Sequence, residues 1–275
     1  MKKYAYFIFI FAFLVACKTT QLPQNQEKTK ITNAALADSV LAYALDHEAL
    51  YTLIDTLKPM SSVKFLRFAV AKDSTQKDGD FKITTKDSLL NKIEEYQKIC
   101  QDLSKDDWQF IMMPFARTEK SMRNIEIYVV RKSVFAKKIQ QYQAFFGQWG
   151  FTPSTNPAVV LAVVEYESKW DRNRAYGYLF GYPAHAVDFF VEAQKIQDSS
   201  PDKKFVTRDF FPIPVFVKEK GYFTYATPKG YKPVEVDNNL LKAATQTLEK
   251  YKSVRGKYVV GKGLQGLGLW EELKK

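Results

Sequence analysis

The chain has 275 residues, of which 46% are hydrophobic and 15% aromatic, so it can bury a substantial core and is not intrinsically disordered. Two cysteines exclude a disulfide framework, and two histidines leave little for a histidine-rich metal site, so we expect no metal and no cofactor. The net charge of +11 is spread evenly, with no block of five or more like charges, and we therefore expect no nucleic-acid partner.

The N-terminus carries a targeting signal. Lys2 and Lys3 form a short basic start, residues 4–15 are apolar, and Leu14-Val15-Ala16-Cys17 ends the stretch with small residues before a cysteine. Because a membrane-spanning helix needs roughly 20 apolar residues, this shorter stretch is typical of a cleaved signal. Its last four residues resemble the lipobox of bacterial lipoproteins.

This resemblance implies that Cys17 becomes the mature N-terminus and carries acyl chains such as palmitate, which are the protein's contact with the membrane. The protein would then lie in the cell envelope, at the outer membrane or the periplasmic face. The alternative is an ordinary secretory signal with a chance cysteine. The basic excess suits anionic lipid head groups or an anionic cell-wall polymer as further partners.

The sequence predicts a signal peptide over residues 1–16, a lipidated flexible tether over 17–31 and one globular domain over 32–275. A helix is expected from Thr32 or Asn33 to Pro59, because its apolar positions follow 4-3 spacing through His47. A strand follows at 63–70, then a polar turn at 72–80 and a helix at 86–103. Residues 108–115 and 125–130 predict a hairpin with a longer loop.

The second half continues in the same mixed pattern. We expect a helix over 135–149, another that begins at Asn156-Pro157, a glycine-punctuated link over 172–183 and a helix over 184–196. A second hairpin is expected at 210–217 and 222–226, then a last helix through Leu240 and Tyr251 and a glycine-rich tail. No regular βαβ rhythm is present. We therefore expect an α+β fold, with a mixed or antiparallel sheet of about five strands packed against about six helices.

Several short motifs have a structural explanation. Cys100 falls on the apolar face of the 86–103 helix, so we expect a buried thiol. Residues 261–266 match G-x-G-x-x-G but lack the helix, strand and acidic residue that a dinucleotide site needs, so we expect the tail to pack against the domain. His47 occupies an apolar helix position and is expected to be partly buried, and His185 is expected to pair with Asp188.

One segment resembles a catalytic motif. The residues 163–171, in which Glu167 and Ser168 follow an apolar helix, are similar to the helix end of lytic transglycosylases and goose-type lysozymes. The resemblance implies that Glu167 is a general acid that protonates a glycosidic oxygen. The glycine-leucine-methionine-glutamine segment of those enzymes is absent here. The alternative is a solvated glutamate at the end of a helix.

The link after this segment offers candidate ligand-binding residues. In an extended conformation, the aromatic residues at 176, 178, 180 and 182 would lie on one side, and the candidates are Arg172, Arg174, Tyr176, Tyr178 and Tyr182. The alternative is a set of rings packed against the core. Because Gly177 and Gly181 bend the segment, we expect at least one of the three tyrosines to be packed and at least one exposed.

These observations favour a lipid-anchored envelope protein that acts by binding or structural support. The alternative is a peptidoglycan-cleaving enzyme of the lytic transglycosylase or lysozyme type with Glu167 as its acid.

Overall fold

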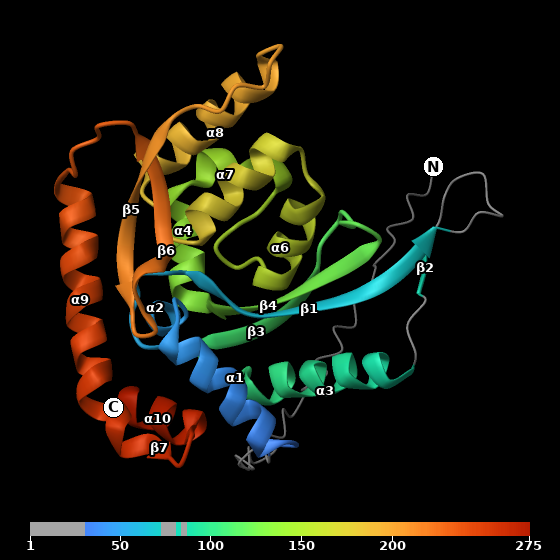
Figure 1. Ribbon diagram of the computed structural model, residues 1–275, viewed down its shortest axis with the longest axis vertical. Coiled ribbons are helices and arrows are strands. Elements are labelled where there is room, and N and C mark those ends of the chain that lie inside the picture. Colours follow the sequence, from blue (N-terminus) through green and yellow to red (C-terminus); the bar gives the residue numbers. More distant parts are fainter. Residues whose placement is uncertain (1–30, 73–80, 84–86) are drawn as a thin grey trace, which may run out of the picture. The chain divides into compact units, whose positions relative to one another are not determined.

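A four-stranded antiparallel sheet with the order β2-β1-β4-β3 lies between two groups of helices in the computed structural model (Figure 1). The structure describes residues 31–72, 81–83 and 87–275, and residues 31–275 form one compact unit. The predicted signal peptide, Cys17 and most of the tether lie outside the described residues, as does the polar turn predicted at 72–80 except for Lys72, which is the last residue of β1.

The strands form three separate antiparallel sheets, because β5 pairs with β6 and β7 with β8. Their bounds are β1 Met60–Lys72, β2 Phe81–Ile83, β3 Trp108–Pro114, β4 Met122–Arg131, β5 Arg208–Val215, β6 Lys218–Pro228, β7 Val259–Val260 and β8 Gly263–Leu264. The expectation of mixed helix and sheet is confirmed, but the single sheet of about five strands is wrong. The β5–β6 hairpin packs mainly against helices rather than extending the large sheet.

The described residues also form ten α-helices rather than about six. Their bounds are α1 Ala34–Asp46, α2 Leu50–Leu53, α3 Asp87–Leu103, α4 Lys132–Gln141, α5 Gln143–Phe146, α6 Pro157–Tyr166, α7 Lys169–Leu179, α8 Ala184–Ser199, α9 Glu235–Arg255 and α10 Gly266–Leu273. Two 3₁₀ turns, Gly147–Trp149 and Gly256–Tyr258, follow α5 and α9. None of the helices in the described ranges is long and apolar enough to cross a membrane.

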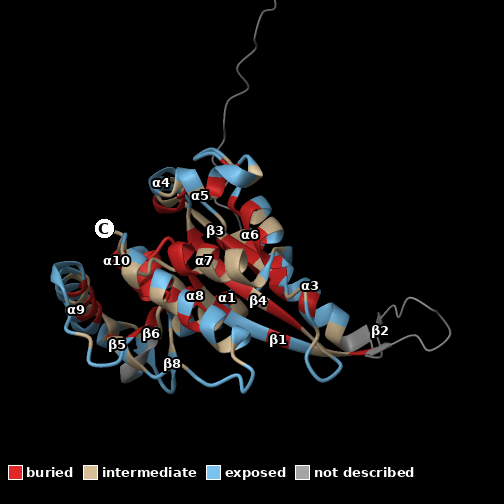
Figure 2. Cartoon of the chain, turned by 90° about the horizontal axis from the view of Figure 1, so that it is seen from above, coloured by how far each residue is buried: buried red, intermediate tan, exposed pale blue. Residues whose placement is uncertain are grey.

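Strand β4 divides the core, because its side chains alternate between the two faces of the sheet. Ile127 and Val129 face one cluster, to which α1 and α3 also contribute, and Tyr128 and Val130 face a second cluster with α4, α6 and α7. Figure 2 shows the buried residues gathered along β3, β4 and the helices against them. Both faces of this strand are therefore covered.

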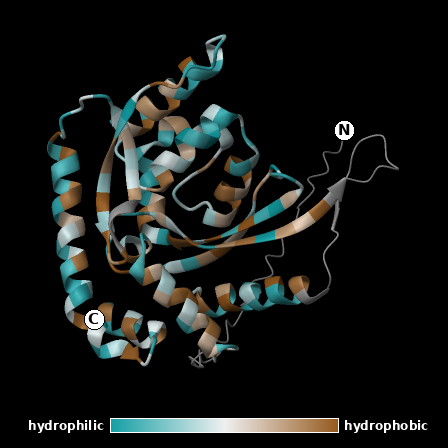
Figure 3. Ribbon diagram, in the orientation of Figure 1, coloured by the Kyte–Doolittle hydropathy of each residue, from teal (hydrophilic) through white to brown (hydrophobic). Residues whose placement is uncertain are grey.

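The C-terminal half closes the first cluster. Helix α9 buries Ala244, Leu248 and Tyr251. Hydrophobic and hydrophilic residues alternate along α3 and α9, as expected for amphipathic helices with one buried face (Figure 3). The glycine-rich tail is a short hairpin followed by α10, and its Trp270 is fully buried against Trp108 and Phe110. The predicted packing of the tail is thus confirmed, although the tail is regular structure.

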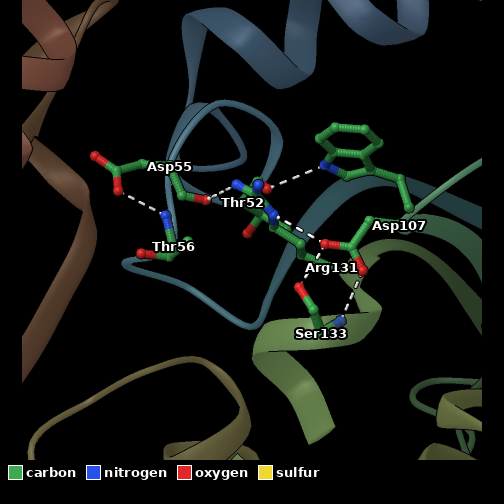
Figure 4. Close-up of polar contacts among 7 residues, drawn as sticks. Thr52, Asp55, Thr56, Asp107, Arg131 and Ser133 are labelled. Atoms are coloured by element: carbon green, nitrogen blue, oxygen red, sulfur yellow. Dashed lines mark hydrogen bonds and ion pairs between the residues drawn. The ribbon is translucent and has the colours of Figure 1, made fainter. Parts of the chain in front are cut away.

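A polar cluster fixes the junction between β4 and α4 (Figure 4). Arg131 donates to the carbonyl of Asp55 at 2.7 Å and pairs with Asp107 at 3.2 Å. Asp107 also accepts from the backbone N–H of Ser133 at 2.8 Å and from its hydroxyl at 2.5 Å. Burial opposes ionisation, but these hydrogen bonds and Arg131 hold the pKa of Asp107 below its usual value.

Two hairpins match the sequence prediction, and one long helix does not. Strands β3 and β4 pair antiparallel, as do β5 and β6, and Pro114 is the last residue of β3. The helix predicted to run to Pro59 ends at Asp46, because His47 adopts an extended backbone conformation. At this break Asp46 forms an ion pair with Arg255 at 2.8 Å, and Glu48 forms one with Lys58 at 2.5 Å. These tertiary ion pairs form where the helix would otherwise continue.

Candidate functional site

Two glutamates and two arginines line one cavity on the α6–α7 side of the sheet. The cavity, which we call the two-glutamate pocket, has a volume of about 370 Å³ and is lined by Phe115, Arg117, Glu126, Tyr128, Glu165, Arg172, Tyr176 and Phe180. Strand β4, the end of α6 and helix α7 supply five of these residues. The pocket therefore depends on segments that are far apart in the sequence.

Glu126 enters the pocket because it shares its face of β4 with Tyr128 and Val130. Its carboxylate accepts a hydrogen bond from the Tyr128 hydroxyl at 2.9 Å and another from the Ser62 side chain. Burial raises the pKa of Glu126, and the neighbouring carboxylates of Glu48 and Glu165 raise it further. Glu126 is thus a carboxyl group whose ionisation costs free energy.

Glu165 reaches the pocket from the buried face of α6, one turn after Leu161. Only 6% of the residue is exposed. Its carboxylate accepts hydrogen bonds from the Ala116 backbone N–H at 2.9 Å and from the Tyr176 hydroxyl at 2.8 Å. The two glutamates therefore have different hydrogen-bond partners although they line the same cavity.

The loop after β3 is fixed in place by Arg123. The Arg123 guanidinium donates to the carbonyls of Phe115 at 2.5 Å and Ala116 at 2.9 Å. These two bonds orient the backbone so that the N–H of Ala116 points to Glu165. The polar rim of the pocket is therefore preorganised by the chain itself.

Two tyrosines connect the glutamates. The hydroxyl groups of Tyr128 and Tyr176 interact with each other, and each also donates to one glutamate. Burial is the largest cause that raises the pKa of both tyrosines far above the usual value, and the nearby carboxylates add to it. Both hydroxyls therefore stay protonated and act as hydrogen-bond donors at physiological pH.

The charges in the pocket are not paired with one another. Within the described part of the chain, neither Glu126 nor Glu165 forms an ion pair, and the guanidinium groups of Arg117 and Arg172 have no hydrogen-bond or ion-pair partner. Arg117 is exposed and Arg172 is half-buried. Two anionic and two cationic groups are thus available at one cavity.

A second cavity adjoins the first. This apolar pocket has a volume of about 320 Å³ and lies between α7, α8 and the β5–β6 hairpin. Its lining residues are Asn173, Tyr176, Gly177, Phe180, Tyr182, Ala186, Val187, Phe190, Phe210, Thr224, Tyr225 and Ala226, none of them charged. Tyr176 and Phe180 line both cavities, and their rings stack with centroids 5.9 Å apart.

A buried ion pair supports the wall behind these rings. Lys58 is fully buried and contacts Glu48 at 2.5 Å, and its ammonium group lies 5.2 Å from the ring centre of Phe180 and 4.2 Å from that of Phe223. Burial lowers the pKa of Lys58, although Glu48 opposes the shift. The negative charge of Glu48 also acts on Glu126 and helps to keep its pKa raised.

The predicted aromatic link is a helix, so the alternating residues do not share one face. Helix α7 spans Lys169–Leu179, and its first turn is capped by Ser168, whose hydroxyl accepts from the Asp171 N–H at 3.4 Å. On a helix, positions two apart point in different directions. Tyr176 therefore faces the pocket, whereas Tyr178 stacks on Tyr142 with ring centroids 3.7 Å apart.

The remaining candidates on this segment separate in the same way. Arg172 lines the two-glutamate pocket, but Arg174 forms an ion pair with Asp188. Tyr182 lines the apolar pocket, where burial raises its pKa. Tyr178 is buried, and Tyr176 and Tyr182 are half-buried, so the expectation of an exposed ring is wrong. Helix packing, not a flat aromatic stripe, determines these positions.

Glu167 lies apart from the glutamates of the pocket. It caps the C-terminus of α6 with an extended backbone, and its carboxylate accepts from the Trp149 indole N–H at 2.8 Å. It lines neither of the two cavities described above. Its role as a general acid stays a prediction. Sequence reasoning missed Glu126 and Glu165, although the position of Glu165 one turn after Leu161 was a usable signal.

The histidines and the described cysteine have local partners. His47 is half-buried and stacks on Tyr43 with ring centroids 3.8 Å apart. His185 does not pair with Asp188, because it lies 3.3 Å from Asp237 and 3.0 Å from the Tyr231 hydroxyl. Cys100 is buried, as expected, and burial raises the pKa of its thiol to about 12, which makes it a poor nucleophile.

Comparison with known proteins adds no family to this description. No family model matches the chain, and no curated protein or solved structure matches it. Among the described residues, no group of three or more histidine, cysteine, aspartate or glutamate side chains is arranged to hold a metal ion.

Proposed function

We propose that this protein is anchored in the cell envelope by lipid on Cys17 and binds a small charged ligand in the two-glutamate pocket. The observation that carries the proposal is the set of four side chains, Glu126, Glu165, Arg117 and Arg172, which line one cavity without forming ion pairs. A cavity of about 370 Å³ is in the usual size range for small-molecule sites.

The energetics support a ligand rather than a structural role for these charges. A buried carboxylate without a cationic partner destabilises the folded state, as the raised pKa of Glu126 indicates. A purely structural pocket would be more stable with the arginines paired to the glutamates or with apolar side chains in their place. Local departures from the most stable arrangement are typical of functional sites.

The membrane and the wall enter this proposal as surroundings. Two or more acyl chains give stable membrane attachment, whereas one chain alone gives marginal binding. The basic excess of the chain supports contact with anionic lipid head groups or an anionic wall polymer at the domain surface. The ligand itself needs cationic character, because an anion alone would meet the repulsion of Glu126 and Glu165.

Binding to soluble fragments of purified bacterial wall tests the proposal. Calorimetry with the full lipidated chain in nanodiscs should detect binding, and Glu165→Gln should weaken it at least tenfold. Glu167→Gln is the matched control, because Glu167 is a glutamate on the same helix end outside both cavities. If all three proteins bind the fragments equally, or if neither a wall fragment nor the small zwitterion tested below binds, the pocket is not the site we propose.

A second candidate function is cleavage of wall glycan, and one observation favours it. Glycosidases use two carboxyl groups, one protonated and one ionised. Glu126, with its raised pKa, would supply the proton, and Glu165 would be the second carboxyl group of the same cavity. A turbidity assay on purified wall distinguishes this from the role predicted for Glu167. Loss of activity only in Glu126→Gln and Glu165→Gln would assign catalysis to the two glutamates of the pocket. Loss of activity only in Glu167→Gln would assign it to Glu167, as the resemblance implies.

A further inference from the structure

The two-glutamate pocket and the apolar pocket share Tyr176 and Phe180 as a common wall. We infer that the ligand is a free α-amino acid with a large apolar side chain. Its ammonium group binds to Glu126 and Glu165, its carboxylate binds to Arg172 and Arg117, and its side chain enters the apolar pocket. This inference rests on the proposed function and specifies the ligand class.

The charges of the first pocket match a zwitterion. An ammonium group needs acceptors, and both glutamates accept hydrogen bonds there without a cation of their own. A carboxylate needs donors, and a guanidinium group provides several donors in a planar arrangement that fits a carboxylate. Arg172 is the main candidate because it is half-buried, whereas Arg117 is exposed at the rim. A ligand with only one of the two charges would leave two protein charges unpaired.

The second pocket matches an uncharged, preferably aromatic, side chain. Six of its lining residues are aromatic: Tyr176, Phe180, Tyr182, Phe190, Phe210 and Tyr225. Tyr182 contacts both Phe180 and Tyr225, with ring centroids 6.2 Å and 5.9 Å apart. Aromatic rings prefer such tilted or offset partners, so another ring would find favourable contacts in this cavity.

Gly177 determines how closely the two helices beside the shared wall approach each other. A Cβ atom there would lie 2.7 Å from Val187 Cγ2. Helices α7 and α8 can therefore pack closely and hold Tyr176 between the two cavities. In an α-amino acid the ammonium group, the carboxylate and the side chain are all bonded to one carbon atom, so a ligand at the shared wall would direct its charged groups and its side chain to different cavities.

Calorimetry with L-phenylalanine and three matched analogues tests the inference on the full chain in nanodiscs. The analogue 2-phenylethylamine lacks the carboxylate, 3-phenylpropionate lacks the ammonium group, and L-alanine lacks the ring. We expect each analogue to bind at least tenfold more weakly than L-phenylalanine. An analogue that lacks the carboxylate or the ammonium group leaves protein charges in the pocket unpaired, so the loss of affinity should be large in both cases.

Two variants assign each charge to its partner. Glu165→Gln should weaken the binding of L-phenylalanine at least tenfold and should not weaken that of 3-phenylpropionate, because this analogue has no ammonium group and one repelling carboxylate is removed. Arg172→Gln should weaken L-phenylalanine and leave 2-phenylethylamine within threefold. A third variant, Ala226→Leu, tests the apolar pocket because it narrows that cavity. It should weaken the binding of L-phenylalanine and leave the affinity for L-alanine within threefold.

The outcomes separate this inference from the proposed function. If wall fragments bind in a Glu165-dependent way but L-phenylalanine binds no better than its analogues, the ligand class is wrong and the pocket assignment stands. If neither L-phenylalanine nor any wall fragment binds, both are wrong. Equal weakening of all four compounds by each variant would indicate loss of the pocket's structure and would contradict the separate charge assignments.

Discussion

The hydrogen bond between Tyr176 and Glu165 gives a prediction that can be worked out from the structure. Glu165 is 6% exposed and has two donors, the Ala116 N–H at 2.9 Å and the Tyr176 hydroxyl at 2.8 Å. Tyr176→Phe removes one donor and leaves the carboxylate partly unsatisfied. Hydrogen bonds to charged groups contribute about 1.5–3 kcal/mol, so the free energy of unfolding should fall by about that amount. The melting temperature should fall by roughly 3–12 °C.

Tyr178→Phe is the matched control, two residues away on the same helix. The Tyr178 hydroxyl accepts from Arg174 at 3.2 Å, and Arg174 also pairs with Asp188, so its loss leaves no buried charge unsatisfied. We expect a cost below about 1 kcal/mol. Urea unfolding of both variants, each also made with Glu165→Gln, measures the coupling. Equal losses in the two variants, or a Tyr176→Phe loss that is unchanged beside Glu165→Gln, would refute the reasoning.

Three further predictions concern charge and attachment. Because burial raises the pKa of Glu126, ionisation of this group destabilises the fold at neutral pH. Glu126→Gln should therefore raise the free energy of unfolding by on the order of 1 kcal/mol at pH 7. This gain should shrink as pH falls through the raised pKa of Glu126. Urea unfolding at pH 7 and pH 5 measures this, and a loss of stability at pH 7 would contradict it. Asp237 is fully buried and accepts hydrogen bonds from Tyr225 and Tyr231, each at 2.5 Å. Burial opposes ionisation of Asp237, but these bonds hold its pKa low. The stability that the ionised carboxylate gives to the fold is therefore present at neutral pH and lost as pH falls through that low pKa. Asp237→Asn should cost about 2–3 kcal/mol in urea unfolding at pH 7, and a cost near zero would show that the three groups are not coupled. Cys17→Ser should release the protein from the membrane fraction after a high-salt wash, and retention of the variant would refute the lipid anchor.

Sequence pattern predicted the elements that are regular over several turns or strand positions. The β3–β4 and β5–β6 hairpins follow from apolar runs separated by polar turns, and Asn156 with Pro157 begins α6 as a cap and first-turn proline should. Cys100 lies buried because its helix has a continuous apolar face. In these cases the local signal and the tertiary packing agree.

The failures have tertiary causes or overlooked local signals. The apolar spacing through His47 continues past the end of α1, but the ion pairs of Asp46 and Glu48 favour a break there. The alternating aromatic residues of α7 suggested an extended chain. The pattern of Ser168 with Asp171 three residues later is a helix-start signal that outweighs it, and the two side chains contact each other at 2.9 Å.

The candidate site was only partly predictable for a related reason. Arg172 and Tyr176 were singled out for charge and aromatic character, and both line the pocket. Glu126 was not, because β4 is covered on both faces and its residues do not alternate between apolar and polar. Only the pairing of β4 with its neighbours and the helices above it brings this glutamate close to Glu165.

Amide hydrogen exchange with and without ligand tests the central claim most directly, because it locates binding without any substitution. With L-phenylalanine or a binding wall fragment, we predict increased protection in residues 115–128 and 165–180, including the Ala116 N–H that donates to Glu165. Protection elsewhere with no change in these two segments would contradict the assignment of the two-glutamate pocket as the functional site.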